Sequence, residues 1–416
     1  MGFCLFWEIL RCLSLQRFFV YIAYIVYFES WETLYFLYWG GMIMEKDCIN
    51  IDASIRSALT DRMSLSDLES VRLILEGNSI IDWNRANFRN NEEAEEFLQL
   101  HHFHLSNPLD VRRLKYLREA SIAYLEDQFN LRFPDDIKFA QDMRSILVMA
   151  SQTGGFRRRQ ILCCVILKLM HVLQHLDAAE LRHQLPLAEA DLLELASKKI
   201  DKASRAMRKS GLPIVSFYGS RKARNSIITK LLAKSDNIAA TVFDKLRYRI
   251  VTETRSAIVP TLVWLARNLF PFNYVIPGES HNNLLEFENL TKQSVYRHLL
   301  DELQSNGIEK KNEMFEVNGF SGSNYRIINF IVDVPVRVDH IVPSVQYQTL
   351  GNIVYVMVEF QILDKETALL NEQGDSAHSL YKQRQLEQVQ IRLRKGGRKK
   401  RDLSKTTNES DQGNPK

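Results

Sequence analysis

A single carboxylate interrupts an otherwise apolar stretch near the end of the chain. Residues 353–362 are rich in Val, Ile, Tyr and Met, a composition that predicts a β-strand. Glu359 lies inside this run, where a charge is costly unless it is paired or binds a metal. Gln361 follows two residues later, so both side chains leave the same face of the strand. The pair therefore marks a candidate functional site.

A basic segment follows an earlier predicted strand. Arg221, Lys222, Arg224 and Lys230 lie at the entry and in the first turns of a predicted helix. The backbone N–H groups and dipole of a helix start already favour anions, and cationic side chains add to that preference. A triphosphate is the natural ligand of such a segment. The alternative is a solvated basic helix start with no ligand.

An acidic residue precedes the next predicted strand. Asp244 lies directly before a segment in which Arg247 and Arg249 share one face. One or two carboxylates beside substrate phosphates are what a magnesium site needs, and phosphate-binding cations are predicted nearby. The alternative is a surface Asp–Arg pair, which would contribute little to stability.

A glycine-containing loop, residues 319–324, leads into a further predicted strand. Tyr325 and Arg326 stand at the edge of that strand. A tyrosine there can stack on a nucleobase, an interaction that contributes roughly 1–3 kcal/mol. The alternative is a tyrosine that only packs in the core.

In this order, the segments resemble the synthetase domain of RelA/SpoT-type alarmone synthetases, over roughly residues 213–385. Synthetase domains of this type contain five sequence motifs in a fixed order. The fourth and fifth, which lie close together within Tyr355–Lys382 here, carry the most specific likeness. The residues that match the five motifs in turn are Lys222, Ser226, Ile227 and Lys230; Asp244 and Arg249; Tyr325; Glu359, Gln361 and Ile362; and Ala377, His378, Tyr381 and Lys382.

The resemblance implies a nucleotidyltransferase-like fold that transfers the β,γ-pyrophosphate of ATP to the 3′-hydroxyl of GDP or GTP, with Mg²⁺ as cofactor. Asp244 would hold the metal. Glu359 would orient or deprotonate the attacking hydroxyl and contact the metal, and Tyr325 would stack on the acceptor guanine. The nucleotide-binding residues that the resemblance implies are Arg221, Lys222, Ser226, Lys230, Arg249, Tyr325, Arg326, Gln361 and His378.

The sequence also departs from the family pattern. Ser220 stands in the register of the first arginine, with Arg221 one place late, and Arg247 replaces a glycine. Asn329 stands at a histidine position, and Leu363-Asp364 replaces Arg-Thr. The acceptor therefore need not be a guanosine nucleotide. Two alternatives stay open: a catalytically degenerate nucleotide- or RNA-binding protein of the same fold, and a pyrophosphotransferase that acts on RNA.

The elements that must position these residues divide the chain into four predicted segments. Residues 44–205 show helical patterns and predict an all-helical N-terminal domain. Residues 206–391 alternate strands with helices, which predicts an α+β domain around one mixed sheet flanked by helices. Residues 1–43 form a hydrophobic, aromatic-rich leader, and residues 392–416 form a basic tail that we expect to be disordered.

The first helix of the N-terminal domain is predicted from a capping box of Ser66 and Glu69 and from a stop at Gly77. A turn is predicted at Gly219–Lys222. The other predicted helices are 92–101, 109–128, 136–151, 157–178, 187–209, 225–234, 255–268 and 365–390, and the predicted strands are 213–217, 248–251, 325–336 and 353–362.

Charge and cysteine content favour a cytoplasmic protein. The net charge is only +4, yet residues 392–401 carry seven basic side chains in ten. That run is a candidate RNA contact, and a solvated tail is its alternative. The five cysteines show no C-x-x-C spacing, which argues for a reducing compartment and against a structural zinc site.

The leader has three readings. Its apolar run, Phe18–Phe28, is short for a membrane span and lacks a signal-peptide cleavage site. It is an interfacial anchor, which would give peripheral membrane association, or a helix packed on the body, or sequence upstream of a true start at Met42 or Met44. In the last two cases, a chain that begins at either methionine should fold.

Two groups of histidines remain. His171 and His175, with Asp177, place two imidazoles on one helix face, as in a metal site or the remnant of a hydrolase site. No adjacent His-Asp doublet accompanies them. The histidines of segment 101–104 have no partner ligands nearby in the sequence, so we expect them on a loop or helix surface.

Overall fold

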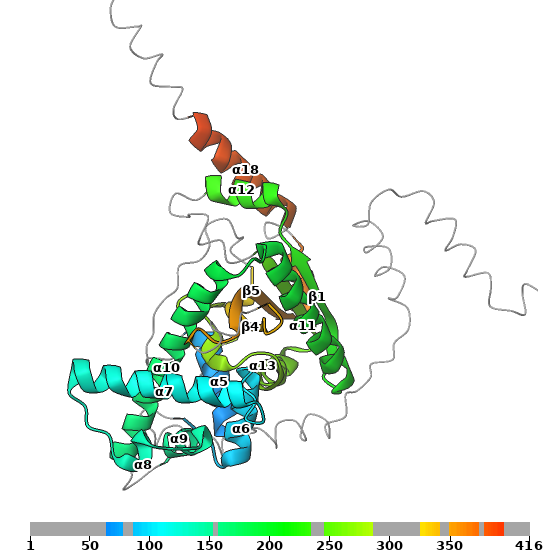
Figure 1. Cartoon of the computed structure of the whole chain (residues 1–416). Helices are drawn as coiled ribbons and strands as arrows, with labels where there is room; N and C mark the ends of the chain where they lie inside the picture. Colours follow the sequence, from blue (N-terminus) through cyan, green and yellow to red (C-terminus); the bar gives the residue numbers. More distant parts are fainter. Residues whose placement is uncertain are drawn as a thin grey trace, which may run out of the picture. The chain divides into compact units, whose positions relative to one another are not determined.

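The computed structural model describes residues 64–77, 86–152, 157–233, 245–285, 325–341, 349–373 and 378–394. These residues form a five-stranded mixed sheet with helices on both faces, preceded along the chain by a helical region (Figure 1). The predicted α+β class is therefore confirmed. The leader, residues 1–43, lies outside the described residues.

The helical region begins with a capped helix. In α5 the N-cap is Ser64, whose hydroxyl accepts from Asp67 N while the Asp67 carboxylate accepts from Ser64 N. The predicted box of Ser66 and Glu69 is therefore wrong, because Glu69 pairs with Arg72 instead. The helices that precede the sheet are α5 (Leu65–Glu76), α6 (Asn91–Leu100), α7 (Pro108–Phe129), α8 (Asp135–Lys138), α9 (Met143–Met149), α10 (Arg157–Gln184) and α11 (Glu189–Lys209).

The helix predicted over 136–151 is two helices in the structure. α8 ends at Lys138, and α9 begins after Asp142, whose carboxylate accepts from Arg144 N as an N-cap. An aspartate that caps a new helix start competes with the continuation of the old helix, which explains the break.

The sheet has the strand order β1-β2-β5-β4-β3. β2 and β5 are parallel, and the other neighbouring pairs are antiparallel. The strands are β1 (Ile214–Arg221), β2 (Leu246–Thr252), β3 (His281–Asn282), β4 (Ile328–Arg337) and β5 (Ile353–Asp364). The helices among them are α12 (Arg224–Ala233), the 3₁₀ turn Arg255–Ala257 followed by α13 (Ile258–Asn268), the 3₁₀ turn Phe272–Tyr274, α17 (Lys365–Asn371) and α18 (His378–Arg394).

The turn predicted at Gly219–Lys222 is wrong, because β1 continues through Arg221. Gly219 pairs with Tyr248 of β2, and a Cβ at Gly219 would lie 2.6 Å from Cε1 of the tyrosine ring. The glycine is required by this close approach of a ring rather than by a turn.

The helix predicted over 365–390 is also divided. The Asp364 carboxylate caps α17 by accepting from Thr367 N and Thr367 Oγ1, and α17 ends at Asn371. α18 begins at His378, and residues 374–377 lie outside the described part of the chain.

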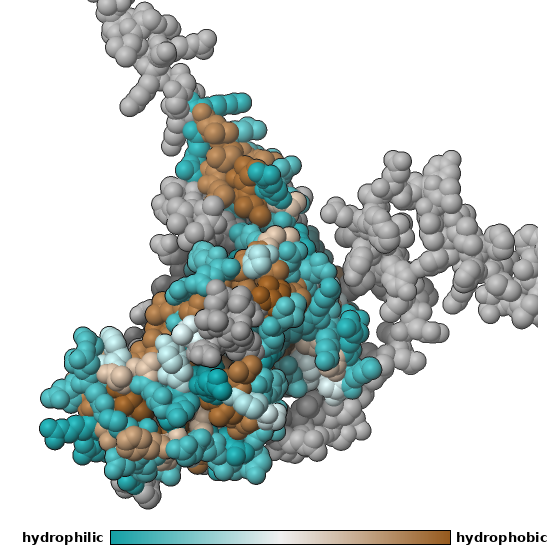
Figure 2. Space-filling view, in the orientation of Figure 1, coloured by the Kyte–Doolittle hydropathy of each residue, from teal (hydrophilic) through white to brown (hydrophobic). Residues whose placement is uncertain are grey.

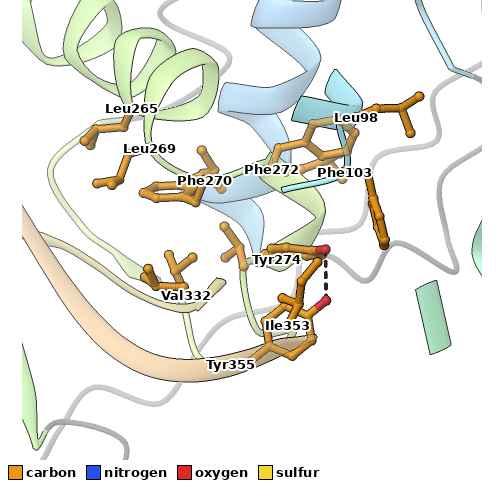
Figure 3. Packing of buried hydrophobic residues seen from close by; sticks show 14 of the residues in the cluster. Leu98, Phe103, Leu265, Leu269, Phe270, Phe272, Tyr274, Val332, Ile353 and Tyr355 are labelled. Carbon is orange, nitrogen blue, oxygen red and sulfur yellow. Dashed lines mark hydrogen bonds between the residues drawn. The ribbon is translucent and has the colours of Figure 1, made fainter. Parts of the chain in front are cut away.

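The centre of one face of the sheet forms an apolar layer. Phe360 of β5 and Phe330 of β4 pack on Phe270, which follows α13, with ring centroids 5.3 and 6.0 Å from that of Phe270. Val332, Leu265 and Leu269 join this layer (Figure 3). The same buried cluster continues into the helices before the sheet.

The opposite face is covered at one end by α10. The imidazole of His175 stacks on Tyr355 of β5, with 4.1 Å between ring centroids and 5° between planes. The Tyr355 hydroxyl donates to the Tyr274 hydroxyl at 2.9 Å (Figure 3). His175 Nε2 lies 3.5 Å from Asp333 Oδ2 of β4. Glu359 and Gln361 lie further along this face, so α10 borders the part of the sheet that carries them.

Charged side chains also join the helical region to the sheet. Arg337 of β4 donates to Asp110 of α7 at 2.8 Å, and Asp110 is almost fully buried. Arg113 of α7 donates to Asp177 of α10 and to the carbonyl oxygen of Thr349, just before β5. The domain boundary predicted between residues 205 and 206 falls inside α11 and stays a prediction.

The histidines lie differently from expectation. His101 is buried rather than on a surface, and its Nδ1 and Nε2 lie 2.7 Å from Phe97 O and 3.1 Å from Asn273 Oδ1. Burial lowers the pKa of His101 to about 4. His171 and His175 pack on one another and on Tyr274. Across the described ranges, no cluster of three or more potential ligands could hold a metal ion.

Two apolar features of the structure bear on membrane and partner contacts. Of the helices described, α10 alone is long and apolar enough to span a membrane by length and composition, and it packs on α7, α9 and β5. Figure 2 shows hydrophobic residues over α12 and α18, which pack together. The exposed ones are Ile228, Leu232, Leu386, Ile391 and Leu393.

The buried His101 predicts a pH-dependent stability. The unfolded chain binds a proton below the ordinary pKa of 6.5, whereas the folded chain does so only near 4. Stability is therefore fully present above pH 6.5 and falls as the pH drops toward 4. We expect His101 alone to account for a loss of about 2 kcal/mol between pH 7 and pH 5 in urea unfolding.

His101→Gln should reduce the slope of unfolding free energy against pH. His340→Ala, which removes an exposed histidine, should leave that slope unchanged. A slope in His101→Gln equal to that of the wild-type chain would contradict the assignment.

Candidate functional site

The polar face of the sheet carries two adjacent rows of side chains. Residues paired across neighbouring strands point to the same face. The first row runs across all five strands and consists of Tyr218, Arg249, Gln361, Asn329 and His281. The second row consists of Ser220, Arg247, Glu359 and Ile331. The prediction that Glu359 shares a face with Gln361, and Arg247 with Arg249, is therefore confirmed.

Hydrogen bonds link the two rows. Arg249 donates to Gln361 Oε1 from Nε at 3.2 Å and from Nη2 at 3.1 Å. Gln361 Nε2 in turn donates to Glu359 Oε1 at 3.0 Å. Because the arginine holds the amide oxygen, the amide nitrogen is directed at the carboxylate. The orientation of Glu359 is thereby fixed through Gln361.

The two oxygens of the Glu359 carboxylate differ in their surroundings. The side chain is 6% exposed, and its Oε2 has no hydrogen-bond partner among the residues that the structure describes. Leaving a buried polar atom unsatisfied typically costs about 1–3 kcal/mol, and more for a charged group. An oxygen held in this way is suited to accept a proton, a hydrogen bond or a metal ion.

Tyr325 is positioned by two asparagine side chains that bind its backbone. Asn283 Nδ2 donates to Tyr325 O at 2.7 Å, and Asn283 Oδ1 accepts from Ile327 N at 2.7 Å. Asn371, at the end of α17, accepts from Arg326 N at 3.0 Å and donates to Arg326 O at 2.7 Å. Each amide thus occupies an N–H and a C=O of residues 325–327, so this segment is fixed before β4 begins.

The Tyr325 hydroxyl belongs to the same electrostatic environment as the rows. Burial raises its pKa, while the positive charges of Arg249 and Arg247 act in the opposite direction. The negative charges of Glu359 and Glu372 raise it further. The structure therefore places Tyr325 in the same charged environment as Glu359, Arg249 and Arg247.

The basic segment is divided between different surroundings. Arg221 pairs with Leu246, on the sheet face opposite Glu359, and its charge acts on Tyr248 and Glu194. The structure thus does not bring Arg221 to the polar rows. Lys222 follows the end of β1, and its backbone N–H donates to Lys245 O at 3.0 Å.

The remaining predicted residues lie on helices or outside the described chain. Ser226 and Lys230 lie on α12, and Arg326 is exposed beside Tyr325. His378 is the first residue of α18, and Asp244 lies outside the described residues. In the basic run 392–401, Arg392 donates to Leu232 O at 2.5 Å and so joins α18 to α12.

Two positioning residues, Asn283 and Asn371, escaped sequence reasoning. Each acts by binding a backbone segment more than forty residues away in the chain. Asparagine after a strand or at a helix end ordinarily indicates a turn or cap, so no local signal distinguishes this use.

Comparisons with known proteins found solved structures of low similarity and no family. No family model matches the sequence, and no curated protein does. Small alarmone synthetase 2 from Bacillus subtilis is 15% identical over 51% of this chain and 92% of that chain, with a TM-score of 0.27. Small alarmone synthetase 1 from Bacillus subtilis, bound to its product pppGpp, is 15% identical over 51% and 95%, with a TM-score of 0.27.

A GTP pyrophosphokinase family protein from Streptococcus pneumoniae is 15% identical over 51% of this chain and 89% of that chain, with a TM-score of 0.22. At these identities and TM-scores, the likeness carries neither a residue role nor an activity to this chain.

The asparagine pair predicts a specific stability effect. Asn371→Asp keeps an oxygen that accepts from Arg326 N, but it can no longer donate to Arg326 O and sets a charge beside that carbonyl. We expect urea unfolding to show a loss of about 1–3 kcal/mol. Asn225→Asp, exposed in the first turn of α12, should cause no loss, because a carboxylate is favourable near a helix N-terminus. Equal losses in both variants would refute this account of Asn371.

Proposed function

We propose that the chain is a nucleotide pyrophosphokinase that transfers pyrophosphate from ATP to the 3′-hydroxyl of a guanosine nucleotide. The observation that carries this proposal is Glu359, a buried carboxylate with one oxygen held by Gln361 and the other without a partner among the described residues. The RelA/SpoT-like order of the sequence motifs supplies the choice of substrates.

Glu359 acts on the attacking hydroxyl. The 3′-oxygen of the acceptor forms a bond to the β-phosphorus of ATP, and the bond from that phosphorus to the oxygen bridging it to the α-phosphorus breaks, so AMP leaves. The hydroxyl proton passes to Glu359 Oε2 and then to solvent. Gln361 and Arg249 keep the carboxylate oriented during this transfer.

Cations and an aromatic ring hold the two substrates. Arg247, opposite Glu359 on β2, stabilises the negative charge that accumulates on the transferred phosphates. Lys222 and Lys230 bind the ATP phosphates, and Tyr325 stacks on the acceptor base.

The carboxylates of the site could supply part of the coordination shell of a magnesium ion. A buried carboxylate oxygen without a partner in the described chain is the kind of ligand that Mg²⁺ prefers, and one or two carboxylates suffice when substrate phosphates complete the shell. Glu359 and Asp244 would hold the ion. When bound, the ion would neutralise negative charge on the phosphates.

The decisive experiment incubates the full chain with γ-labelled ATP, Mg²⁺ and a panel of acceptors that includes GDP, GTP, ADP and RNA with a free 3′-hydroxyl. Label on a guanosine nucleotide supports the proposal. Label on RNA alone identifies the RNA-directed alternative. Nucleotide binding without any transfer identifies the catalytically degenerate alternative.

Glu359→Gln should abolish most of the transfer activity. The change preserves the shape of the side chain but removes the proton acceptor, and general-base assistance is typically worth about 10²–10⁴-fold in rate. We expect kcat to fall by that factor. Glu366→Gln, exposed on α17, should retain wild-type kcat. Unchanged kcat in Glu359→Gln would remove this residue from the mechanism.

Tyr325→Ala should act on the acceptor alone. Loss of stacking should raise the acceptor KM by roughly tenfold to a hundredfold and leave the ATP KM unchanged. Tyr325→Phe keeps the ring, so its acceptor KM should stay within about threefold of the wild-type value. A Phe variant as impaired as the Ala variant would assign the role to the hydroxyl instead.

A further inference from the structure

The first polar row ends on an edge strand that no sequence motif indicates. His281 of β3 pairs with Asn329 of β4, and Asn329 pairs with Gln361 of β5. His281 therefore shares the face and the row of Gln361 and Arg249. It is the last residue of the row in which Arg249 binds Gln361 and Gln361 binds the Glu359 carboxylate.

Asn329 carries a hydrogen-bond acceptor on this face. Its Oδ1 is buried and has no hydrogen-bond partner within the described part of the chain. Glu359 Oε2, in the neighbouring row, is also buried and has no hydrogen-bond partner among the described residues. Buried acceptors are nearly always satisfied in native proteins. Two such oxygens on one face point to a ligand that brings its own donors.

His281 complements Asn329. The imidazole is half-buried, and burial lowers its pKa, so the ring is neutral at pH 7. A neutral imidazole offers one donor and one acceptor. A ligand group placed between His281 and Asn329 could therefore donate to the amide oxygen and exchange a second hydrogen bond with the ring.

The same short segment also determines where Tyr325 lies. Asn283, two residues after His281, binds Tyr325 O and Ile327 N. Tyr325 lies four residues before Asn329, so the two are separated by at most about 13 Å of chain, a distance that one nucleotide can bridge. The segment 281–283 thus presents His281 and positions Tyr325 at once.

We propose that His281 and Asn329 form a subsite for the acceptor nucleotide, in which Asn329 Oδ1 accepts a hydrogen bond from the ligand and His281 binds beside it. The donor is the 2-amino group of the base or the 2′-hydroxyl of the ribose. This subsite rests on the proposed function for the identity of the acceptor, but its binding test does not require transfer.

The test measures equilibrium binding of GDP to the full chain in the presence of Mg²⁺ and α,β-methylene-ATP. His281→Ala and Asn329→Leu should each raise the Kd of GDP roughly three- to tenfold. Neither change should alter the Kd of the ATP analogue. His340→Ala, exposed on the turn after β4, serves as the control and should change neither constant.

Two analogues identify the donor. IDP lacks the 2-amino group of the base, and 2′-deoxy-GDP lacks the ribose hydroxyl. The wild-type chain should bind one of them more weakly than GDP, and Asn329→Leu should abolish that difference, because the same hydrogen bond is then missing in both cases. Should Asn329→Leu fail to fold, loss of GDP affinity in His281→Ala and its partial recovery in His281→Gln carry the test.

The outcomes separate this inference from the proposed function. A wild-type chain that binds GDP without transferring pyrophosphate, and loses affinity in His281→Ala, refutes the enzyme and supports the subsite. Transfer that persists with unchanged GDP affinity in both variants, at unchanged melting temperature, overturns the subsite alone. A wild-type chain that binds no nucleotide overturns both.

Discussion

The candidate site depends on accommodating one carboxylate buried inside a sheet. Glu359 lies on β5, which has a neighbouring strand on each side, so little water reaches it. A buried charge must be compensated by opposite charge or hydrogen bonds. Gln361 supplies a hydrogen bond, Arg247 lies directly opposite, and Arg249 holds Gln361. The two arginines of β2 and the glutamine of β5 thus form one electrostatic unit with the acid, and replacing any one of them changes the environment of all.

The aromatic member of the site is held by a different principle. Tyr325 precedes β4, and amide side chains replace the strand hydrogen bonds that its segment would otherwise need. Asn283 binds on one side and Asn371 on the other. Asn371 ends the helix that Asp364 begins, so the length of α17 determines where the second amide lies. Leu363 and Asp364 both serve the fold here: Leu363 is buried, and Asp364 caps α17.

Sequence reasoning succeeded where one periodic pattern determines the outcome. The two-residue period of strands places Glu359 with Gln361 and Arg247 with Arg249, and long helices such as α7 and α10 follow from their patterns. It failed where distant packing decides. Gly219 indicates a turn until the ring of Tyr248 is known to lie against it. β3 has only two residues and exists because β4 offers an edge. His101 is polar in isolation, but Phe97 O and Asn273 satisfy it in the core.

β5 joins the helical region to the site within a few residues. Tyr355 stacks on His175 of α10, and Glu359 follows four residues later on the same sheet face. On β4, Arg337 pairs with Asp110 of α7, while Asn329 lies in the polar row. The helical region therefore could not be replaced freely by another domain during evolution. A substitution at Asp110 or His175 would favour a compensating change at the strand residue that it contacts. Related chains should therefore show correlated variation between the helical region and the strands, and the residues of this interface should be inherited together.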